Sequence, residues 1–182
     1  MAKLISKTYG DALLSIAVEE DKLDSFDEEV VALREVLKDN PDLGSCINNP
    51  RISVDDKLDI ISNVFTGRIT DELLGFLKIV VEKNRFDCID EILEYFIDEV
   101  KKLKGIGVAY VTTPSELSDE QKKMVEAKLL GTTDYKTMEM HYLINEELIG
   151  GMQIRIGDRI VDSSVQTKIM KLKQDFIKIQ LG

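Results

Sequence analysis

Apolar residues recur at intervals of three and four positions throughout the first 105 residues. Ile5, Tyr9 and Ile16 belong to the first such stripe, which stops at the acidic cluster of residues 19–21. Because residues three and four positions apart lie on the same face of an α-helix, each stripe predicts a helix with one buried side. Later stripes predict a second helix that ends before Asn40-Pro41 and four more helices in the segments that follow it: residues 43–47, 54–64, 71–83 and 89–104.

Capping residues stand at the expected starts of three helices. Ser53 has Asp56 three positions later, and Ser118 has Gln121 at the same spacing, which is the arrangement of a capping box or a variant of it. Thr70 precedes two acidic residues, whose charges favour the positive end of a helix dipole. Thr70 is therefore expected to be the N-cap of the fifth helix.

At Gly105 the apolar period changes from about 3.6 residues to about 2. Alternation over residues 108–112 predicts a strand that ends at Thr113-Pro114, because proline lacks the backbone donor that a sheet needs. A helix follows, and then a second strand over residues 138–144. The apolar residues expected to line that helix are Met124, Val125 and Leu129. We place a domain boundary at Gly105.

The stretch after residue 150 predicts a hairpin. Met152, Ile154 and Ile156 alternate with polar residues, which is typical of a half-buried strand, and Gly157-Asp158 then supplies turn chemistry. A three-residue connection would set Ile156 opposite Ile160, whereas a two-residue connection would set Ile156 opposite Arg159. We favour the three-residue connection, because it pairs two apolar residues.

A final helix is predicted after Val161. Ser163 and Gln166 stand at capping-box spacing, and an apolar stripe follows them: Val165, Ile169, Leu172, Phe176 and Ile179. The predicted fold is therefore α+β, with an N-terminal six-helix bundle over residues 1–105. A small α/β domain over residues 106–182 follows it, with a mixed sheet that helices cover on one face.

Charge narrows the class of partner. The chain carries 24 basic and 34 acidic side chains, a net charge of −10. Residues 1–105 hold 14 basic and 23 acidic side chains (14 − 23 = −9), and residues 106–182 hold 10 and 11 (10 − 11 = −1). An acidic surface repels phosphate backbones and anionic headgroups, so binding to nucleic acid or to a membrane surface is disfavoured. The expected partner is a protein.

Membrane insertion and export are not expected either. The longest apolar runs, such as residues 73–77, are far shorter than the roughly 20 residues that span a bilayer. The N-terminal residues show no secretory or organelle-targeting pattern, so the sequence is expected to be bacterial-type or already processed. Cys46 and Cys88 fit no metal or redox spacing and are expected to be reduced packing residues.

The sequence offers few parts for catalysis. His141 is the single histidine and lies on the polar side of a predicted strand next to Glu139, so we expect an ordinary surface residue. No glycine-rich phosphate loop is present, and the adjacent carboxylates of Glu28-Glu29, Asp55-Asp56 and Glu146-Glu147 are typical of solvated helix ends and turns. No cofactor, metal or catalytic residue is expected.

The segment from Ile149 to Val165, IGGMQIRIGDRIVDSSV, resembles the signature of the delta subunit of F-type ATP synthases, the family of the mitochondrial oligomycin-sensitivity-conferring protein. The residues that carry this likeness are Gly150, Gly151, Gly157, Asp158, Arg159, Asp162 and Ser163. Residues 7–13, 74–86 and 111–118 also resemble segments of that family, so the likeness covers nearly the whole chain. These seven residues are expected to have structural roles.

The resemblance implies a non-catalytic stator subunit of the peripheral stalk. The N-terminal bundle would bind the N-terminal helix of an alpha subunit of the catalytic head, and the C-terminal domain would bind the C-terminal ends of the b subunits. The head would then resist rotor torque during proton-driven ATP synthesis, at the cytoplasmic face of the bacterial cell membrane. The alpha-binding residues carried over from the family lie on the first and fifth helices, with their outward members left open: Tyr9, Ala12, Leu13, Ile16, Leu73, Phe76, Leu77 and Val80.

Two alternatives belong to other classes of protein. A compact helical bundle of this size could be an RNA-binding or antitermination-like factor, although the charge of −9 in residues 1–105 opposes that interpretation. A small enzyme built around His141 with Cys46 or Cys88 is the other alternative, and no substrate suggests itself.

Overall fold

The computed structural model describes residues 2–157 and 159–180, and the chain forms two compact units, residues 1–101 and 102–182. The division falls in the last turn of the sixth helix, just before the period change at Gly105. The two units are described separately below and are called unit 1 and unit 2.

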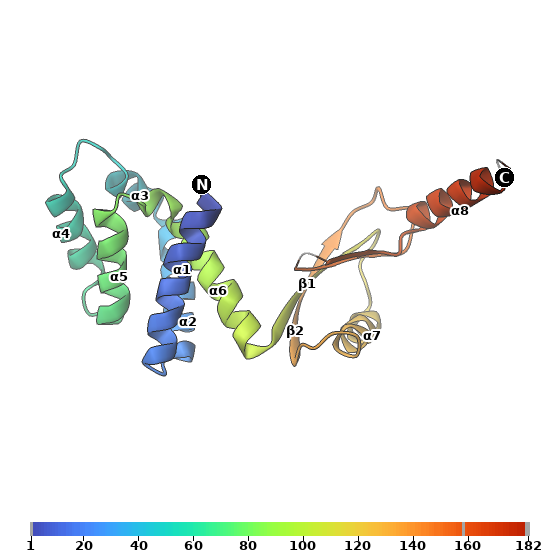
Figure 1. Cartoon of the computed structure of the whole chain (residues 1–182), viewed down its shortest axis with the longest axis horizontal. Coiled ribbons are helices and arrows are strands. Elements are labelled where there is room, and N and C mark those ends of the chain that lie inside the picture. The colour runs from blue at the N-terminus through green and yellow to red at the C-terminus, as the bar shows by residue number, and fades with distance from the viewer. Residues whose placement is uncertain (1, 158, 181–182) are drawn as a thin grey trace. The chain divides into compact units, whose positions relative to one another are not determined.

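All the regular elements that the structure describes in unit 1 are helices, joined by turns and loops (Figure 1). Ser53 accepts a hydrogen bond from the backbone N–H of Asp56 at 3.1 Å, so the predicted cap of the fourth helix is confirmed. The helices are α1 (Ala2–Glu19), α2 (Leu23–Asp39), α3 (Pro41–Ile47), α4 (Val54–Phe65), α5 (Asp71–Glu82), the short 3-10 helix η1 (Phe86–Cys88) and α6 (Ile89–Lys104).

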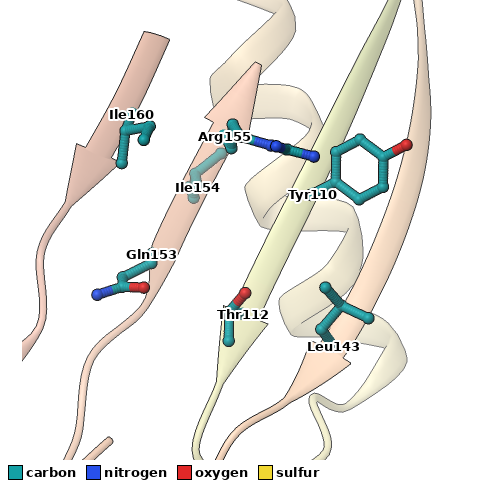
Figure 2. A pocket seen from close by; sticks show the side chains of 7 residues that line it. All are labelled: Tyr110, Thr112, Leu143, Gln153, Ile154, Arg155 and Ile160. Atoms are coloured by element: carbon teal, nitrogen blue, oxygen red, sulfur yellow. The ribbon is translucent and has the colours of Figure 1, made fainter. Parts of the chain in front are cut away.

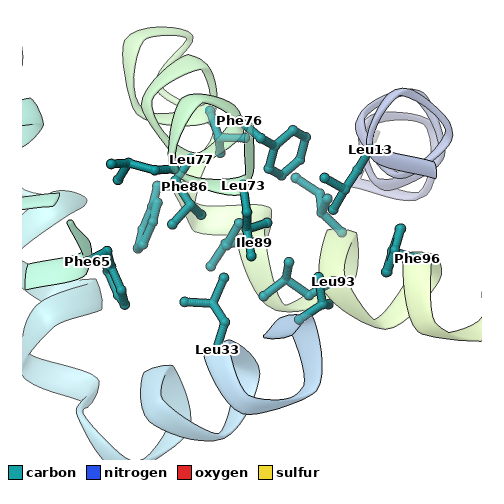
Figure 3. Close-up of a cluster of buried hydrophobic side chains, with 14 of the residues drawn as sticks. Leu13, Leu33, Phe65, Leu73, Phe76, Leu77, Phe86, Ile89, Leu93 and Phe96 are labelled. Atoms are coloured by element: carbon teal, nitrogen blue, oxygen red, sulfur yellow. The ribbon is translucent and has the colours of Figure 1, made fainter. Parts of the chain in front are cut away.

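One hydrophobic core joins the elements of unit 1 (Figure 3). Leu13 of α1, Phe26 of α2, Ile61 of α4, Leu73 of α5 and Phe96 of α6 are completely buried in it. Burying a large apolar side chain contributes about 1.5–3 kcal/mol, so these contacts stabilise a bundle whose separate helices would be marginal in water.

Thr70 is the N-cap residue of α5, as predicted, but its side chain makes no cap hydrogen bond. Instead the Thr70 backbone N–H and hydroxyl both donate to one carboxylate oxygen of Glu29, each at 2.9 Å. A carboxylate accepts from two donors more strongly than a lone hydroxyl accepts from one N–H. Glu29 lies on α2, so the bond ties α2 to the start of α5, a pairing that spacing along the chain could not reveal.

Unit 2 contains a four-stranded sheet with the strand order β2-β1-β3-β4. The pair β1 and β2 is parallel, while the pairs β1 with β3 and β3 with β4 are antiparallel, so the predicted mixed sheet is confirmed. Its elements are β1 (Ile106–Thr113), α7 (Asp119–Leu130), β2 (Thr137–Ile144), β3 (Gln153–Ile156), β4 (Arg159–Asp162) and α8 (Val165–Gln180).

Helix α7 covers one face of this sheet. Ala109 and Val111 of β1 are fully buried and form a core with Val125 and Leu129 of α7. Met124 was expected to join this core but is 72% exposed, because it precedes Val125 by one residue and so points about 100° away around the helix. The predicted capping box at the start of α7 is confirmed, with Ser118 as the N-cap.

The predicted hairpin connection is wrong. Ile156 pairs with Arg159 across a two-residue turn, and Arg155 pairs with Ile160. Gly157 adopts a φ of +53°, the left-handed geometry that two-residue hairpin turns require to match the twist of their strands. Turn geometry therefore overrides the pairing of two isoleucines, and Ile160 lies on the sheet face that α7 does not cover. Asp158 lies outside the described residues.

The cap of α8 also differs from the prediction by one residue. The side chain of Ser164, not that of Ser163, accepts from the backbone N–H of Thr167 at 3.2 Å. Ser163 instead donates its hydroxyl and its N–H to the carbonyl of Met152, at 2.9 and 3.0 Å. The stripe of α8 is described only in part, since the side chains of Leu172, Phe176 and Ile179 lie outside the described residues.

Two helical glycines in unit 1 should respond oppositely to alanine. A Cβ on Gly10 would lie 2.3 Å from the ring of Tyr95, which is held by its hydrogen bond to Asp11, whereas a Cβ on Gly75 would meet nothing within 4 Å. Alanine favours a helix over glycine by about 1 kcal/mol, and overpacking costs about 1–3 kcal/mol. We expect Gly75→Ala to raise the free energy of unfolding by about 1 kcal/mol and Gly10→Ala to lower it by about 1 kcal/mol, measured by urea denaturation. Equal effects of the two substitutions would contradict the packing of α1 against α6.

Candidate partner-binding surfaces

The structure divides the eight residues proposed for alpha-subunit binding into two groups. Ala12 is exposed, while Tyr9 and Ile16 are half-buried on the same helix. The other five are buried side chains of the unit 1 core: Leu13, Leu73, Phe76, Leu77 and Val80. Buried residues shape a surface from beneath but do not reach a partner, so α5 must present other residues to it.

The outward residues of α5 next to α1 are Gly75 and Ile79. The rings of Tyr9 and Phe76 meet edge to face with centroids 6.4 Å apart, which fixes where α1 packs against α5. Beside that contact, Ile79 is 50% exposed, and space lies open above Gly75. No role was predicted from the sequence for Ile79. Its position four residues after Gly75, on the same helix face, was the signal.

Tyr9, Ala12, Ile16, Gly75 and Ile79 are called the α1/α5 surface below. Small residues on both helices, Ala12 and Gly75, leave room for another helix to approach closely, and the other three members of the surface are apolar. An amphipathic helix with apolar residues three and four positions apart would match this arrangement.

An ion pair stands at one end of the α1/α5 surface. Lys22 lies 3.2 Å from Glu72, which precedes Gly75 by three residues, and 3.4 Å from Glu20. The hydrogen bond and charge of Glu72 raise the pKa of Lys22, while a backbone hydrogen bond and then Lys22 lower the pKa of Glu72. All three side chains are well exposed, so the surrounding water screens the pair and it contributes little to stability.

The glycine pair near residue 150 forms a close backbone crossing in unit 2. Gly151 has a φ of +83°, and a Cβ there would lie 2.5 Å from the carbonyl oxygen of Ser163. A Cβ on Gly150 would lie 3.1 Å from the side chain of Val165, and the Val165 N–H donates to the Gly150 carbonyl at 2.9 Å. The chain entering β3 thus lies against the chain leaving β4, and a side chain at Gly151 has no room.

Asp162 organises the turn from β4 into α8. Its carboxylate accepts from the backbone N–H of Ser164 at 2.8 Å, from the Thr167 hydroxyl at 2.8 Å and from the amide of Gln153 at 3.0 Å. Hydrogen bonds from Ser164 and then Thr167 lower the pKa of Asp162 to about 2. Asp162 and Ser163 therefore hold the backbone together, and Arg159 is an exposed residue of β4.

This network predicts a pH dependence of stability. A carboxyl whose pKa is depressed in the folded state contributes stability that is complete above its unfolded pKa, near 4, and is lost as the pH falls through about 2. We expect Asp162→Asn to remove part of the stability loss between pH 4 and pH 2, measured as the urea midpoint at each pH. A mutant and a parent with identical slopes in that window would contradict the network.

The side chains considered for catalysis, His141, Cys46 and Cys88, make contacts that are ordinary for structural residues. The Nε2 atom of His141 lies 2.9 Å from a carboxylate oxygen of Glu139, and the His141 ring stacks on Tyr110 with centroids 4.9 Å apart. Cys46 and Cys88 are free, and burial, with the nearby Asp87, raises the pKa of the Cys88 thiol, so its reactive thiolate is disfavoured.

Two of the three adjacent acidic pairs contain a residue that makes a structural hydrogen bond. Besides Glu29 with Thr70, the Asp56 carboxylate accepts from the Ser53 hydroxyl at 2.6 Å. Among residues 2–157 and 159–180 no group of three or more metal-binding side chains comes together. No helix in that part of the chain is long and apolar enough to span a bilayer.

Comparisons with known proteins identify the family of the chain. Residues 5–176 match the family model for the ATP synthase delta (OSCP) subunit. The chain is 44% identical over 182 residues to the ATP synthase subunit delta of Lachnoclostridium phytofermentans, covering 100% of both chains. It is also 33% identical over 174 residues to the ATP synthase subunit delta of Chlorobium chlorochromatii, covering 96% of this chain and 97% of the relative.

A solved structure shares the fold. The chain matches one chain of the mitochondrial ATP synthase hexamer of Toxoplasma gondii with a TM-score of 0.75 at 18% sequence identity. The match covers 94% of this chain and 97% of that chain. At this level of identity the match supports the arrangement of helices and sheet and nothing finer.

Proposed function

This chain belongs to the ATP synthase delta (OSCP) subunit family, and from that membership we propose that it joins the catalytic head of an ATP synthase to the peripheral stalk through two separate surfaces. It is a non-catalytic subunit of that complex, a stator that keeps the head from turning with the rotor. The two alternatives, an RNA-binding factor and a small enzyme, are wrong.

The head contact is assigned to unit 1. Helices α1–α6 act together as one bundle that presents the α1/α5 surface to the N-terminal helix of an alpha subunit. The observation that carries this assignment is the open space above Gly75 beside the exposed Ala12 and Ile79, which a helix with apolar residues at i, i+3 and i+7 would fill. The charge of −9 in residues 1–105 favours a partner helix with basic residues on its flanks.

The stalk contact is assigned to unit 2, which would bind the C-terminal ends of the b subunits. The complete chain would then lie at the cytoplasmic face of the bacterial cell membrane as a peripheral part of the complex, and the host enzyme would couple ATP synthesis to proton flow. Two contacts on one chain raise the effective concentration of each contact once the other has formed, which suits a tether under torque.

Calorimetric titration of the chain with a synthetic peptide from the N-terminus of the host's alpha subunit tests the head contact. We expect saturable binding with one peptide per chain. A folded chain that binds no peptide would contradict the proposed head contact, because the α1/α5 surface is present in the absence of other subunits.

A further inference from the structure

The sheet face of unit 2 that α7 leaves uncovered carries a hollow of about 240 Å³ (Figure 2). Cross-strand partners share a face, and β1 places Tyr110 opposite Arg155 of β3 and Thr112 opposite both Leu143 of β2 and Gln153 of β3. Seven residues line the hollow, of which Ile154 belongs to the face that α7 covers. The other six define the open sheet face: Tyr110, Thr112, Leu143, Gln153, Arg155 and Ile160.

Large apolar side chains on this face are exposed within unit 2. Ile160 is 69% exposed and Leu143 is 51% exposed, on opposite sides of the hollow. Exposed apolar groups of this size that surround a few polar groups are typical of a surface that a protein partner covers. The two-residue turn sets the register of β4 and thereby also places Ile160 on this face, where a partner could contact it.

A charge lies between the two apolar sides. The Arg155 guanidinium carbon lies 4.7 Å from the centre of the Tyr110 ring (Figure 2). That ring also stacks on His141, so the ring holds the cation in place. No carboxylate of the described residues lies within ion-pair distance of Arg155, whereas His141 has its carboxylate in Glu139. Arg155 thus offers an oriented, unpaired positive charge between the exposed side chains of Leu143 and Ile160.

From this arrangement we infer that the open sheet face is the docking site of an amphipathic partner helix that carries a carboxylate among its apolar residues. The apolar side chains of the helix cover Leu143 and Ile160, and its carboxylate pairs with the planar guanidinium of Arg155, which binds carboxylates through two parallel N–H groups. The inference rests on the proposed function, because the stalk subunits supply the helix, and it adds the face and the charge that they must use.

Electrostatic repulsion argues against two other occupants of the open sheet face, helix α8 and a second copy of this chain. Helix α8 of this chain is rich in lysine and carries Lys168, Lys171 and Lys173, so its approach to Arg155 is repulsive. A second copy would meet the same face with the same charge, and two facing arginines would repel each other. A partner helix with a carboxylate leaves no unpaired charge in the contact.

The test measures binding of the full chain to the soluble part of the host's b subunits by calorimetry. We expect Arg155→Glu and Ile160→Asp each to weaken binding roughly tenfold or more, and Arg155→Lys to weaken it less, because lysine keeps the charge without the planar geometry. The matched control for Arg155→Glu is Arg159→Glu, and the matched control for Ile160→Asp is Val161→Asp. Both control residues lie on β4, with their side chains on the other face of the sheet. Val161 is 58% exposed, similar to Ile160.

Each outcome decides the inference. Wild-type affinity in both folded face variants overturns the docking site and leaves the stalk contact standing elsewhere on unit 2. Equal losses in the face variants and the controls overturn it as well, because the contact would then not depend on the open face. A wild-type chain that does not bind the b subunits contradicts the proposed stalk contact and the inference together. Arg155 is exposed, so Arg155→Glu retains the fold if Ile160→Asp does not.

Discussion

Gly151→Ala is expected to destabilise unit 2 strongly while unit 1 keeps its stability. The φ of +83° at Gly151 costs an L-residue about 1–2 kcal/mol, and a Cβ 2.5 Å from the Ser163 carbonyl oxygen adds about 1–3 kcal/mol of overpacking. The clash is with backbone, which a rotamer change does not relieve. A unit of this size has a stability of roughly 4–12 kcal/mol, so a loss of about 2–5 kcal/mol removes much of it.

Hydrogen exchange of the full chain locates this effect. Amides of β1 and β3 should lose protection in Gly151→Ala, while amides of α5 and α6 should keep theirs. Gly157→Ala is the matched control, because Gly157 also has a positive φ, of +53°, but a Cβ there meets nothing within 4 Å. We expect the control to lose about 1 kcal/mol, and equal losses in the two variants would show that the close crossing at Ser163 contributes nothing.

The sequence predicted the type of each element well, and local spacing explains why. Helical stripes with residues such as Phe26 and Phe96 reflect one continuous core, and the change of period at Gly105 reflects the start of a sheet. What the sequence missed or misassigned lies where distant residues or backbone geometry decide. Glu29 comes from another helix to bind Thr70, and the glycine turn sets Ile156 opposite Arg159 in place of Ile160.

The candidate surfaces were predictable only in part. A stripe identifies the apolar residues of a helix. It does not tell those that pack in the core from those that bind a partner, because both groups are apolar. The resemblance to the family indicated helices α1 and α5, and the structure then separates buried Leu77 from exposed Ile79. The open sheet face gave no signal in the sequence, because Tyr110, Arg155 and Ile160 meet only through the register of three strands.

A stator must bind at both ends without rearranging its own core. Within the signature, Asp162 and Ser163 serve this need indirectly, since their hydrogen bonds fix the turns around the sheet. Asp162 joins the end of β4 to Thr167 of α8, so the open sheet face and the C-terminal helix share one junction. A rigid junction transmits a load to the partner instead of absorbing it by local unfolding.

Ala12→Arg is expected to weaken binding of the alpha-subunit peptide about 30-fold or more while the bundle stays folded. Ala12 is exposed at the centre of the α1/α5 surface, and a long charged side chain there would occupy the space above Gly75 that the partner helix needs. Loss of a central interface contact of about 2 kcal/mol or more corresponds to that change in affinity. Calorimetric titration of the full chain measures it directly.

Ala32→Arg is the matched control for this substitution, because Ala32 is also an exposed alanine within a helix but lies on α2, outside the α1/α5 surface. Both changes add one positive charge and have similar helix propensity, so a general electrostatic effect on the peptide would appear in both variants. Loss of binding in Ala12→Arg alone would locate the head contact on α1 and α5. Equal affinities in the two folded variants would place the contact on another face of unit 1, and the assignment of Tyr9, Ile16, Gly75 and Ile79 would be wrong with it.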